Sequence, residues 1–246
     1  MMKEKVRLDQ LLVEKGLAEN RSKAQSLIRL GWVMAGGKVV EKPGSLIGKD
    51  SELVIKPAPK YVSRGGIKLE SALRAFGVLV ENKVCLDIGA STGGFTDCLL
   101  QNGAKKVYAL DVGKGLIDQR LRDDPRVIII EKFNARYLSR EIIPEQIELL
   151  SIDVSFISLS LILASAKSVL KPNAEVLALV KPQFELEPKL VKKGVVRDSE
   201  LQLKAVQKVR EFAEKIGFRS LGQTQAGIKG QKGNQEFFLY LILKET

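Results

Sequence analysis

The apolar residues of the chain form short runs that alternate with stretches of helical spacing. Runs of Val, Ile, Leu and Ala predict buried strands over residues 84–87, 106–112, 126–131, 149–153 and 176–181. A helix is expected over 199–215, and the apolar run 237–243 predicts a last strand. Strands that alternate with helices are typical of an α/β fold, so we expect a mostly parallel sheet with helices on both faces.

The first 60 residues carry a different and smaller pattern. Apolar positions at helical spacing within 8–12 and 24–28 predict two short helices. Glycine turns separate three short apolar segments that predict strands over 32–34, 38–40 and 53–55. The sequence Pro-Ala-Pro-Lys over 57–60 is typical of a linker. We therefore predict one domain over residues 1–58, a linker over 59–65 and a second domain over 66–246.

A glycine turn joins the first strand of the second domain to the next helix. The sequence from Val84 to Thr96 reads Val-Cys-Leu-Asp-Ile-Gly-Ala-Ser-Thr-Gly-Gly-Phe-Thr. Such a turn lets a ligand contact backbone N–H groups at the positive end of a helix. The glycine spacing differs from the Gly-x-Gly-x-x-Gly pattern of dinucleotide-binding folds. The alternative interpretation is a strand-to-helix turn of an unrelated α/β domain.

Two further polar residues follow the next predicted strands. Asp111 ends the second strand, 22 residues after Gly89, where a carboxylate binds a ribose diol in nucleotide-binding folds. Asn134 lies just beyond the third strand, where it either meets an adenine edge or is a plain turn residue. The candidate cofactor-binding residues are Asp87, Gly89, Ala90, Ser91, Thr92, Gly93, Gly94, Phe95, Asp111, Val112 and Asn134.

The composition limits the chemistry that is open to this protein. The chain has 246 residues, of which 45% are apolar and 28% charged, enough for one α/β domain and a small module. It contains no histidine, which excludes Ser-His-Asp catalysis and histidine-ligated metals. Cys85 and Cys98 lack metal-ligand spacing, so no metal site is expected. The charged N-terminus and the strand-length apolar runs favour a cytoplasmic protein without a signal peptide or membrane span.

The net charge of +11 indicates a polyanionic partner. Residues 1–60 hold 12 Lys and Arg against 7 Asp and Glu, a net of +5, so positive charge is densest there. Lys and Arg supply salt-sensitive affinity for nucleic-acid phosphates. Many basic proteins have other partners, and charge by itself therefore only favours a nucleic acid.

Four charged residues lie at the ends of predicted elements near the expected ligand crevice. Asp153 and Lys181 end the fourth and fifth strands, at the edge where open α/β sheets bind ligands. Lys68 lies at the start of the helix before the first strand. Glu236 opens the last strand and reaches the same edge only if that strand runs antiparallel. These four residues are the catalytic candidates.

The N-terminal pattern resembles the S-four (alpha-L) RNA-binding domain of ribosomal proteins and pseudouridine synthases. The matching segments are Arg-Leu-Asp-Gln-Leu-Leu-Val-Glu-Lys-Gly-Leu from Arg7, Asn-Arg-Ser-Lys-Ala-Gln-Ser-Leu-Ile-Arg-Leu-Gly from Asn20, and Lys-Val-Val-Glu-Lys-Pro from Lys38. The usual Val-Asn-Gly turn is Ala-Gly-Gly here. The resemblance implies that Arg7, Arg21, Lys23 and Arg29 bind RNA.

Two basic loops of the second domain add further candidates for RNA phosphates. They cover residues 189–198 and 229–234, and each borders the expected crevice. The RNA-binding candidates in these loops are Lys192, Lys193, Lys229 and Lys232. A solvated surface charge is the alternative for each single lysine.

The second domain resembles the S-adenosylmethionine-dependent methyltransferases in its glycine turn. Lys68, Asp153, Lys181 and Glu236 are similar to the Lys-Asp-Lys-Glu tetrad of FtsJ-type RNA ribose 2′-O-methyltransferases. Joined to the N-terminal module, they resemble the TlyA-type family, whose members are called hemolysins or ribosomal RNA methyltransferases. That family implies a Rossmann-like class I methyltransferase domain with a seven-stranded, mostly parallel sheet. It also implies S-adenosylmethionine as cofactor and methyl transfer to a cytidine 2′-hydroxyl of ribosomal RNA.

Alternatives remain for the function and for the role of Lys181. The other functional hypotheses are a membrane-active hemolysin and a non-catalytic RNA-binding factor that keeps the fold. A lysine accepts a proton only in its neutral form, which burial or a neighbouring cation such as Lys68 favours. Nearby carboxylates favour the ammonium form instead. The sequence leaves open whether Lys181 is a base or positions the hydroxyl.

Overall fold

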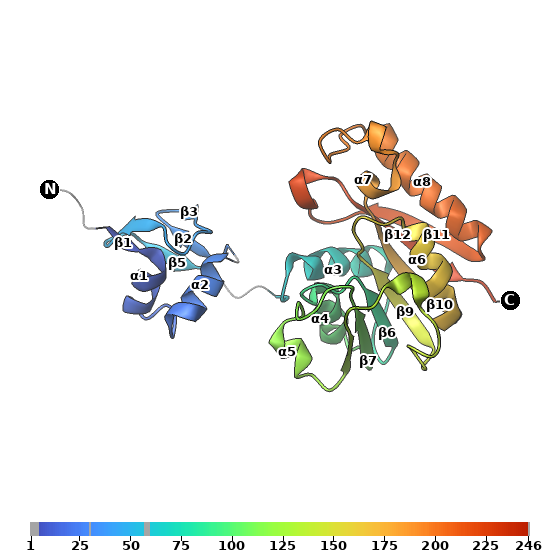
Figure 1. Cartoon of the computed structure of the whole chain (residues 1–246), viewed down its shortest axis with the longest axis horizontal. Coiled ribbons are helices and arrows are strands. Elements are labelled where there is room, and N and C mark those ends of the chain that lie inside the picture. The colour runs from blue at the N-terminus through green and yellow to red at the C-terminus, as the bar shows by residue number, and fades with distance from the viewer. Residues whose placement is uncertain (1–4, 30, 57–59, 246) are drawn as a thin grey trace. The chain divides into compact units, whose positions relative to one another are not determined.

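The computed structural model describes residues 5–29, 31–56 and 60–245 of the chain. These residues form two compact units, Met1–Lys60 and Tyr61–Thr246, which are described separately (Figure 1). The second unit begins five residues before the predicted boundary at Gly66. Tyr61 is buried, and a Cβ added at Gly66 would lie 2.2 Å from its ring. Residues 61–65 of the predicted linker therefore pack as part of the second unit, whereas residue 59 lies outside the described residues.

The first unit packs two helices against short strands. Its elements are β1 (Lys5–Arg7), α1 (Leu8–Glu14), α2 (Arg21–Arg29), β2 (Val33–Ala35), β3 (Lys38–Val39), β4 (Leu46–Gly48) and β5 (Leu53–Ile55). β3, β2 and β5 form an antiparallel sheet, and β1 pairs with β4. The core includes Leu8, Leu12 and Ile28. The two predicted helices and three predicted strands are confirmed, whereas β1 and β4 were not predicted from the sequence.

The second unit is built on a seven-stranded sheet with the order β11-β12-β10-β9-β6-β7-β8. The strands are β6 (Val84–Ile88), β7 (Lys106–Leu110), β8 (Val127–Ile130), β9 (Ile147–Ile152), β10 (Leu170–Val180), β11 (Phe218–Gln225) and β12 (Phe237–Leu243). β8, β7, β6, β9 and β10 run parallel, and β12 is antiparallel to both β10 and β11. The predicted mostly parallel sheet with an antiparallel last strand is confirmed.

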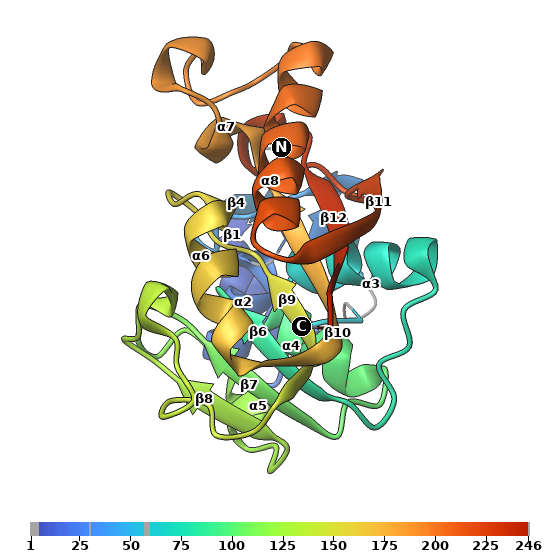
Figure 2. The ribbon, with the colours of Figure 1, turned by 90° about the vertical axis from the view of Figure 1, so that its right-hand side faces the viewer.

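Helices cover both faces of this sheet, as Figure 2 shows for α6 and α3. The helices are α3 (Arg64–Phe76), α4 (Gly94–Gln101), α5 (Gln119–Arg122), α6 (Leu159–Ala166), α7 (Pro182–Glu185) and α8 (Ser199–Lys215). Short 3₁₀ turns are η1 (Ala135–Tyr137), η2 (Lys167–Val169), η3 (Pro188–Leu190) and η4 (Gln231–Gly233). Apolar residues of α3, α4 and α5 share one core with the sheet, and those of α6 and α8 share the other. Strand residues alternate between the two cores because successive side chains point to opposite faces.

The register of the strands brings the catalytic candidates to one edge of the sheet. Val180 of β10 pairs with Phe237 of β12. Lys181 follows Val180 and Glu236 precedes Phe237, so these two residues are neighbours at the edge of the sheet. Ile88 of β6 pairs with Ile152 of β9, which places the glycine turn beside Asp153 in the same way. Glu236 lies at this edge because β12 runs antiparallel to β10.

Candidate active site

Two adjoining cavities open at the carboxyl edge of the parallel strands. The larger one, of about 400 Å³, is lined by all four catalytic candidates together with the glycine turn. The smaller one, of about 290 Å³, lies over the ends of β6 and β7. The two cavities share the lining residues Gly89, Ser91, Asp153, Ser155 and Phe156. One continuous site therefore has room for two chemically different groups.

The catalytic candidates form two ion pairs in the larger cavity. Lys68 Nζ lies 2.6 Å from Glu236 Oε2, and Lys181 Nζ lies 2.5 Å from Asp153 Oδ1. Lys181 Nζ also donates to Ser155 Oγ over 3.0 Å. Both lysine side chains are nearly buried, at 12% and 11% exposed, and Glu236 is 2% exposed. Each lysine is therefore paired with its own carboxylate, and neither ammonium group moves freely in the cavity.

Glycine makes room for the buried Glu236 carboxylate. A Cβ added at Gly230 would lie 1.9 Å from Glu236 Oε1, so a side chain there would displace the carboxylate. The Gly230 N–H donates to the carbonyl of Asn234, which closes the loop directly before Glu236. The backbone of Gly230 therefore packs directly against the Glu236 carboxylate that pairs with Lys68.

The glycine turn after β6 packs tightly against the backbone of Asp153, the residue that follows β9. Gly89 has φ +86°, and a Cβ there would lie 2.3 Å from the Asp153 carbonyl oxygen. Gly94, at the start of α4, would meet Ser63 Oγ at 2.2 Å. Glycine is required at both positions because backbone from neighbouring segments approaches without room for a side chain. The turn, α4 and the Asp153 strand are consequently held at a fixed spacing.

Asp111 lies at the mouth of the smaller cavity with its orientation already set. Its Oδ2 accepts from the Ser91 N–H over 2.8 Å, and its Oδ1 accepts from the Gly113 N–H over 2.7 Å. A carboxylate oxygen accepts more than one hydrogen bond, so both oxygens retain capacity for a ligand. Asn134 lines the same cavity, and its Oδ1 caps η1 by accepting from the Arg136 N–H.

Asp87 is buried beneath the turn and lines neither cavity. Its carboxylate accepts from Thr96 Oγ1 over 2.7 Å and from Ser151 Oγ over 3.2 Å. Burial is the main cause that raises the pKa of Asp87 to about 7, and the nearby charge of Asp153 adds to it. These hydrogen bonds connect Asp87 of β6 to α4 and to β9 beneath the turn.

The other predicted cofactor-binding residues divide between the two cavities. Ala90, Ser91, Thr92, Gly94 and Phe95 line the larger one with Gly89, and Val112 lines the smaller one. Gly93 lines neither, because it caps α4 with φ +93° and faces Leu121. Residues of the glycine turn therefore border both cavities.

Sequence reasoning missed several residues that line the larger cavity. Phe156 is 88% exposed, has φ +61°, and its ring centroid lies 4.8 Å from that of Phe184. A positive φ is costly for a bulky side chain and often marks a functional site. Ser63, Arg64, Ser155 and Gln183 also line this cavity. Their only signal is adjacency in the chain to the predicted residues, since a lining position depends on how separate loops meet.

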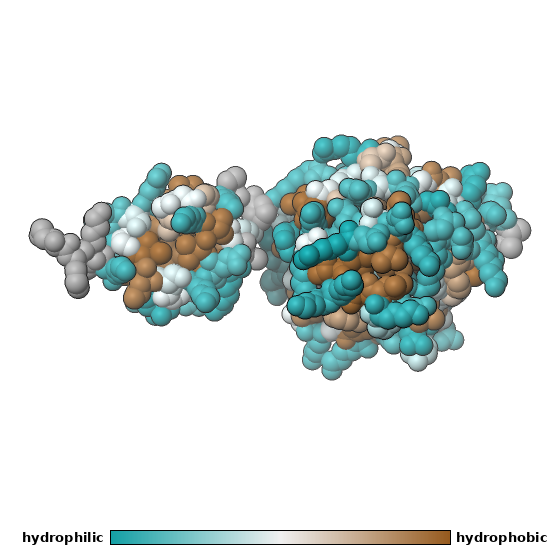
Figure 3. Space-filling model, turned by 90° about the horizontal axis from the view of Figure 1, so that it is seen from above, coloured by the Kyte–Doolittle hydropathy of each residue, from teal (hydrophilic) through white to brown (hydrophobic). Residues whose placement is uncertain are grey.

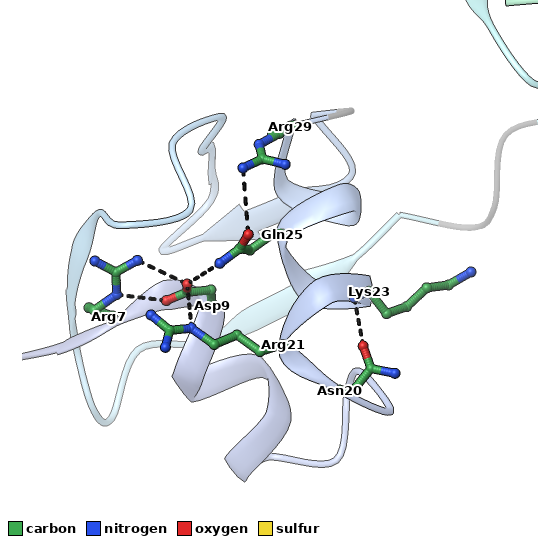
Figure 4. Close-up of polar contacts among 7 residues, drawn as sticks. All are labelled: Arg7, Asp9, Asn20, Arg21, Lys23, Gln25 and Arg29. Atoms are coloured by element: carbon green, nitrogen blue, oxygen red, sulfur yellow. Dashed lines mark hydrogen bonds and ion pairs between the residues drawn. The ribbon is translucent and has the colours of Figure 1, made fainter. Parts of the chain in front are cut away.

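The RNA-binding candidates of the first unit do not form one group. Arg7 and Arg21 both contact the buried carboxylate of Asp9, and Arg29 contacts Gln25 (Figure 4). Lys23 points away from this cluster, as Figure 4 shows. The arginines and Lys23 therefore occupy different local environments, which the sequence did not distinguish.

A buried amide joins the two basic loops of the second unit. Asn234 is 3% exposed; its Nδ2 donates to the Gly194 carbonyl over 2.9 Å, and its Oδ1 accepts from the Val196 N–H over 3.1 Å. The loops around residues 192–196 and 229–234 are thereby held together. The four exposed lysines that they carry are Lys192, Lys193, Lys229 and Lys232.

The surface of the second unit carries an apolar patch on the face that Figure 3 shows, bordered by hydrophilic residues. In the described part of the chain, no helix combines the length and the apolar character needed to cross a membrane. Within the same residues, no group of three or more potential metal ligands comes together.

Comparisons with known proteins agree with this arrangement. The model of the FtsJ-like methyltransferase family matches residues 61–243, and the S4 domain model matches residues 6–53. The "Putative rRNA methyltransferase YqxC" of Bacillus subtilis is 46% identical over 98% of this chain and 87% of that protein.

Two further relatives are similar along nearly their whole length. The 16S/23S rRNA (cytidine-2′-O)-methyltransferase TlyA of Mycobacterium tuberculosis is 40% identical over 98% of this chain and 91% of that protein. A solved structure, "Putative hemolysin from Streptococcus thermophilus", superposes with a TM-score of 0.78 at 42% identity, covering 100% of this chain and 90% of that one. The chain therefore belongs to the FtsJ-like methyltransferase family and carries an S4 domain ahead of its methyltransferase domain.

Proposed function

We propose that this protein transfers a methyl group from S-adenosylmethionine to a ribose 2′-hydroxyl of ribosomal RNA. The observation that carries the proposal is the set of two lysine–carboxylate ion pairs beside the glycine turn. Lys181 with Asp153, and Lys68 with Glu236, line the cavity that the turn borders. Membership of the FtsJ-like family and the names of the rRNA-modifying relatives support this choice of reaction and substrate.

The smaller cavity fits the adenosine part of the cofactor. Its walls are mainly apolar, which suits an adenine ring, and Asp111 offers a preoriented carboxylate to a ribose diol. The turn between β6 and α4 leads from this cavity into the larger one. We therefore assign Asp111, Val112 and Asn134 to the adenosine end of the cofactor, and the turn from Gly89 to Gly94 to its methionine end.

Lys181 is the residue that we assign to the reacting hydroxyl. When bound, S-adenosylmethionine would supply a methyl group on a positively charged sulfur; its transfer to the ribose oxygen would leave the carbon–sulfur electron pair on sulfur and release the hydroxyl proton. Neutral Lys181 would accept that proton at Nζ, whereas charged Lys181 would hold the oxygen in line with the methyl carbon. Asp153 and Ser155 fix Nζ for either role.

The substrate assignment rests on features that favour splayed-out RNA. Phe156 and Phe184 offer exposed aromatic surface at the mouth of the larger cavity, and unstacked RNA bases stack on such rings. The lysine loops beside Glu236 and the S4 domain add positive charge for RNA phosphates. The relative from Mycobacterium tuberculosis is named for cytidine methylation, and we extend cytidine to this chain as the target base.

The decisive experiment measures transfer of a labelled methyl group from S-adenosylmethionine to purified ribosomal subunits. Label that enters RNA and protects one phosphodiester from alkali would identify a 2′-O-methyl group. Lys181→Ala should lower the rate at least about a hundredfold while cofactor affinity, measured by calorimetry, stays near the parent value. Unlabelled RNA from both subunits, with the cofactor still bound, would reject the proposal.

An arginine variant separates the two roles of Lys181. Arginine keeps the positive charge but does not release its proton in proteins. If Lys181 is the base, Lys181→Arg should be as inactive as Lys181→Ala. If it positions the hydroxyl, Lys181→Arg should keep a measurable part of the activity that Lys181→Ala loses.

A further inference from the structure

A single buried carboxylate organises the basic face of the first unit. Asp9 is 0% exposed although it lies among positive charges. Its Oδ1 accepts from Arg7 Nε over 3.0 Å, and its Oδ2 accepts from Arg7 Nη2, Arg21 Nε and Gln25 Nε2, each over 2.9 Å (Figure 4). Arg7 precedes α1 and Arg21 begins α2, so one carboxylate joins the ends of both helices.

The two guanidinium groups held by Asp9 still face solvent. The Arg7 and Arg21 side chains are 41% and 52% exposed. A guanidinium has five N–H groups, and Asp9 accepts only part of those on each arginine. Gly44 also lies close to the Arg7 guanidinium, since a Cβ added there would be 3.1 Å from Nη1. Fixed guanidinium groups with outward N–H donors match the bidentate geometry by which arginine binds phosphate.

The network continues along one face of α2. Arg21, Gln25 and Arg29 are spaced four residues apart and therefore lie on the same side of the helix. Gln25 Oε1 accepts from Arg29 Nη2 over 3.5 Å, which links the third guanidinium to the carboxylate through one side chain. Lys23 lies outside the network, where Figure 4 shows it pointing away. The arginines are thus held in place, whereas Lys23 is only a nearby charge.

We propose that Asp9 is a positioning residue that holds Arg7 and Arg21 as a preformed binding site for phosphates of the RNA backbone. The inference rests on the proposed function for its RNA partner and adds to it the residue that builds the site. Ordering two long side chains in advance removes an entropic cost from RNA binding. The anion offsets one of the two positive charges and leaves the pair with a net charge of +1 to face the RNA.

Replacing Asp9 by Asn changes RNA affinity in opposite directions under the two explanations, simple electrostatics and positioning of the arginines. Asp9→Asn removes a negative charge, so simple electrostatics would tighten RNA binding. If Asp9 positions the arginines, the same change weakens binding.

We would measure the affinity of the full-length protein for a fluorescently labelled RNA hairpin over a range of salt concentrations. Asp9→Asn should weaken binding about tenfold and lower the slope of log affinity against log salt by about one unit. The matched control Asp50→Asn, at an exposed acid of the same unit, should leave binding unchanged or tighter.

A variant that lacks both arginines shows whether the effect of Asp9 on RNA affinity depends on them. In a double variant with Arg7→Ala and Arg21→Ala, adding Asp9→Asn should cause no further loss of affinity. An equal loss in both backgrounds, or tighter binding of Asp9→Asn alone, would overturn the proposal. If thermal unfolding shows that Asp9→Asn does not fold, Gln25→Ala replaces it, with a loss of a few-fold expected only when both arginines are present.

The outcome is independent of the methyl-transfer assay. A protein that methylates ribosomal RNA but binds the hairpin equally well after Asp9→Asn would lose this inference and keep the proposed function. A protein that shows the expected loss of binding without transferring methyl groups would keep the phosphate site and lose the proposed reaction.

Discussion

Asp9 in the first unit and Asp87 in the second are both completely buried, yet their surroundings move their pKa values in opposite directions. Hydrogen bonds from Arg7, with smaller contributions from Gln25 and Arg21, hold the pKa of Asp9 well below its usual range. Burial without a neighbouring cation raises the pKa of Asp87 to about 7. Burial alone therefore does not determine the charge of a carboxylate; the partners that enclose it do.

The number of carboxylates per cation also differs between the two proposed functional surfaces. In the first unit, two arginines share one carboxylate and remain partly exposed, which leaves positive charge for a polyanion. At the edge of the second unit, each lysine has its own carboxylate in a nearly buried setting. Binding a phosphate backbone benefits from uncompensated charge, whereas chemistry on a neutral hydroxyl needs groups that are fixed in place.

The largest expected effect comes from removing the anion of one catalytic pair. Glu236→Gln should leave Lys68 as an unpaired, nearly buried cation, because Gln keeps the shape but not the charge. Breaking such a pair costs about 3–5 kcal/mol of unfolding free energy. We also expect methyl transfer to fall at least about a hundredfold. Urea unfolding and the methyl-transfer assay measure the two effects.

The control for Glu236→Gln is an ion pair of the same sheet outside both cavities. Glu175 in β10 pairs with Lys83 and is partly buried. Glu175→Gln should lower stability without removing activity. Equal activity of the two variants would show that the pair at Glu236 is structural only.

Asp111 should have the next largest effect, on cofactor affinity. Asp111→Asn removes the charge that we assign to the ribose diol and disturbs the hydrogen bonds to Ser91 and Gly113. A hydrogen bond to a charged group contributes about 1.5–3 kcal/mol, which predicts a ten- to hundredfold loss of affinity for S-adenosylhomocysteine by calorimetry. Asp123→Asn, at the residue that follows α5 and outside both cavities, is the control. If Asp111→Asn binds S-adenosylhomocysteine as tightly as the parent protein, Asp111 does not bind the ribose diol.

Asp87 predicts a dependence of stability on pH. The raised pKa means that the folded chain binds a proton that the unfolded chain has released between about pH 4 and pH 7. The unfolding free energy therefore decreases as the pH rises through this window. Asp87→Asn should remove that decrease, by an amount of a few kcal/mol at most. Unfolding curves recorded from pH 4 to pH 8 test it; identical slopes in both proteins would contradict the raised pKa.

Asp9 predicts the opposite pH dependence for the first unit. Its lowered pKa stabilises the folded unit above about pH 4, the value for an unfolded aspartate, and this contribution is lost as the pH falls further. Calorimetry from pH 5 to pH 2 should show the transition of the first unit moving to lower temperature. Asp9→Asn should flatten this change, and the same steep acid dependence in the variant would refute it.

The smallest effect is expected from the lysine loops. Replacing Lys229 and Lys232 by Ala should weaken RNA binding a few-fold and lower its salt dependence, because each lost phosphate contact reduces the slope by about 0.9 at most. The pair Lys192 and Lys193 should behave similarly, since Asn234 holds the two loops together. A slope equal to that of the parent protein would identify these lysines as solvated charges.

The position of three charged candidates at one edge of the sheet was predictable from the sequence. Asp153 and Lys181 directly follow β9 and β10, and Glu236 directly precedes β12, so a parallel sheet with an antiparallel last strand brings them to one edge. The pairing itself was not predictable. The sequence named Lys68 as one neighbouring cation that would favour neutral Lys181, and the structure adds that Lys68 pairs with Glu236, from a distant part of the chain.

The sequence by itself determined the α/β architecture, the bounds of α8 and the glycine turn, because each follows from local apolar spacing or from glycines that fit a turn. Only the tertiary structure decided that Phe156 lines the cavity, that Asp87 lies beneath it and that Asp9 holds two arginines. These properties depend on which side chains meet across separate elements. The spacing of apolar residues within one element does not predict such contacts.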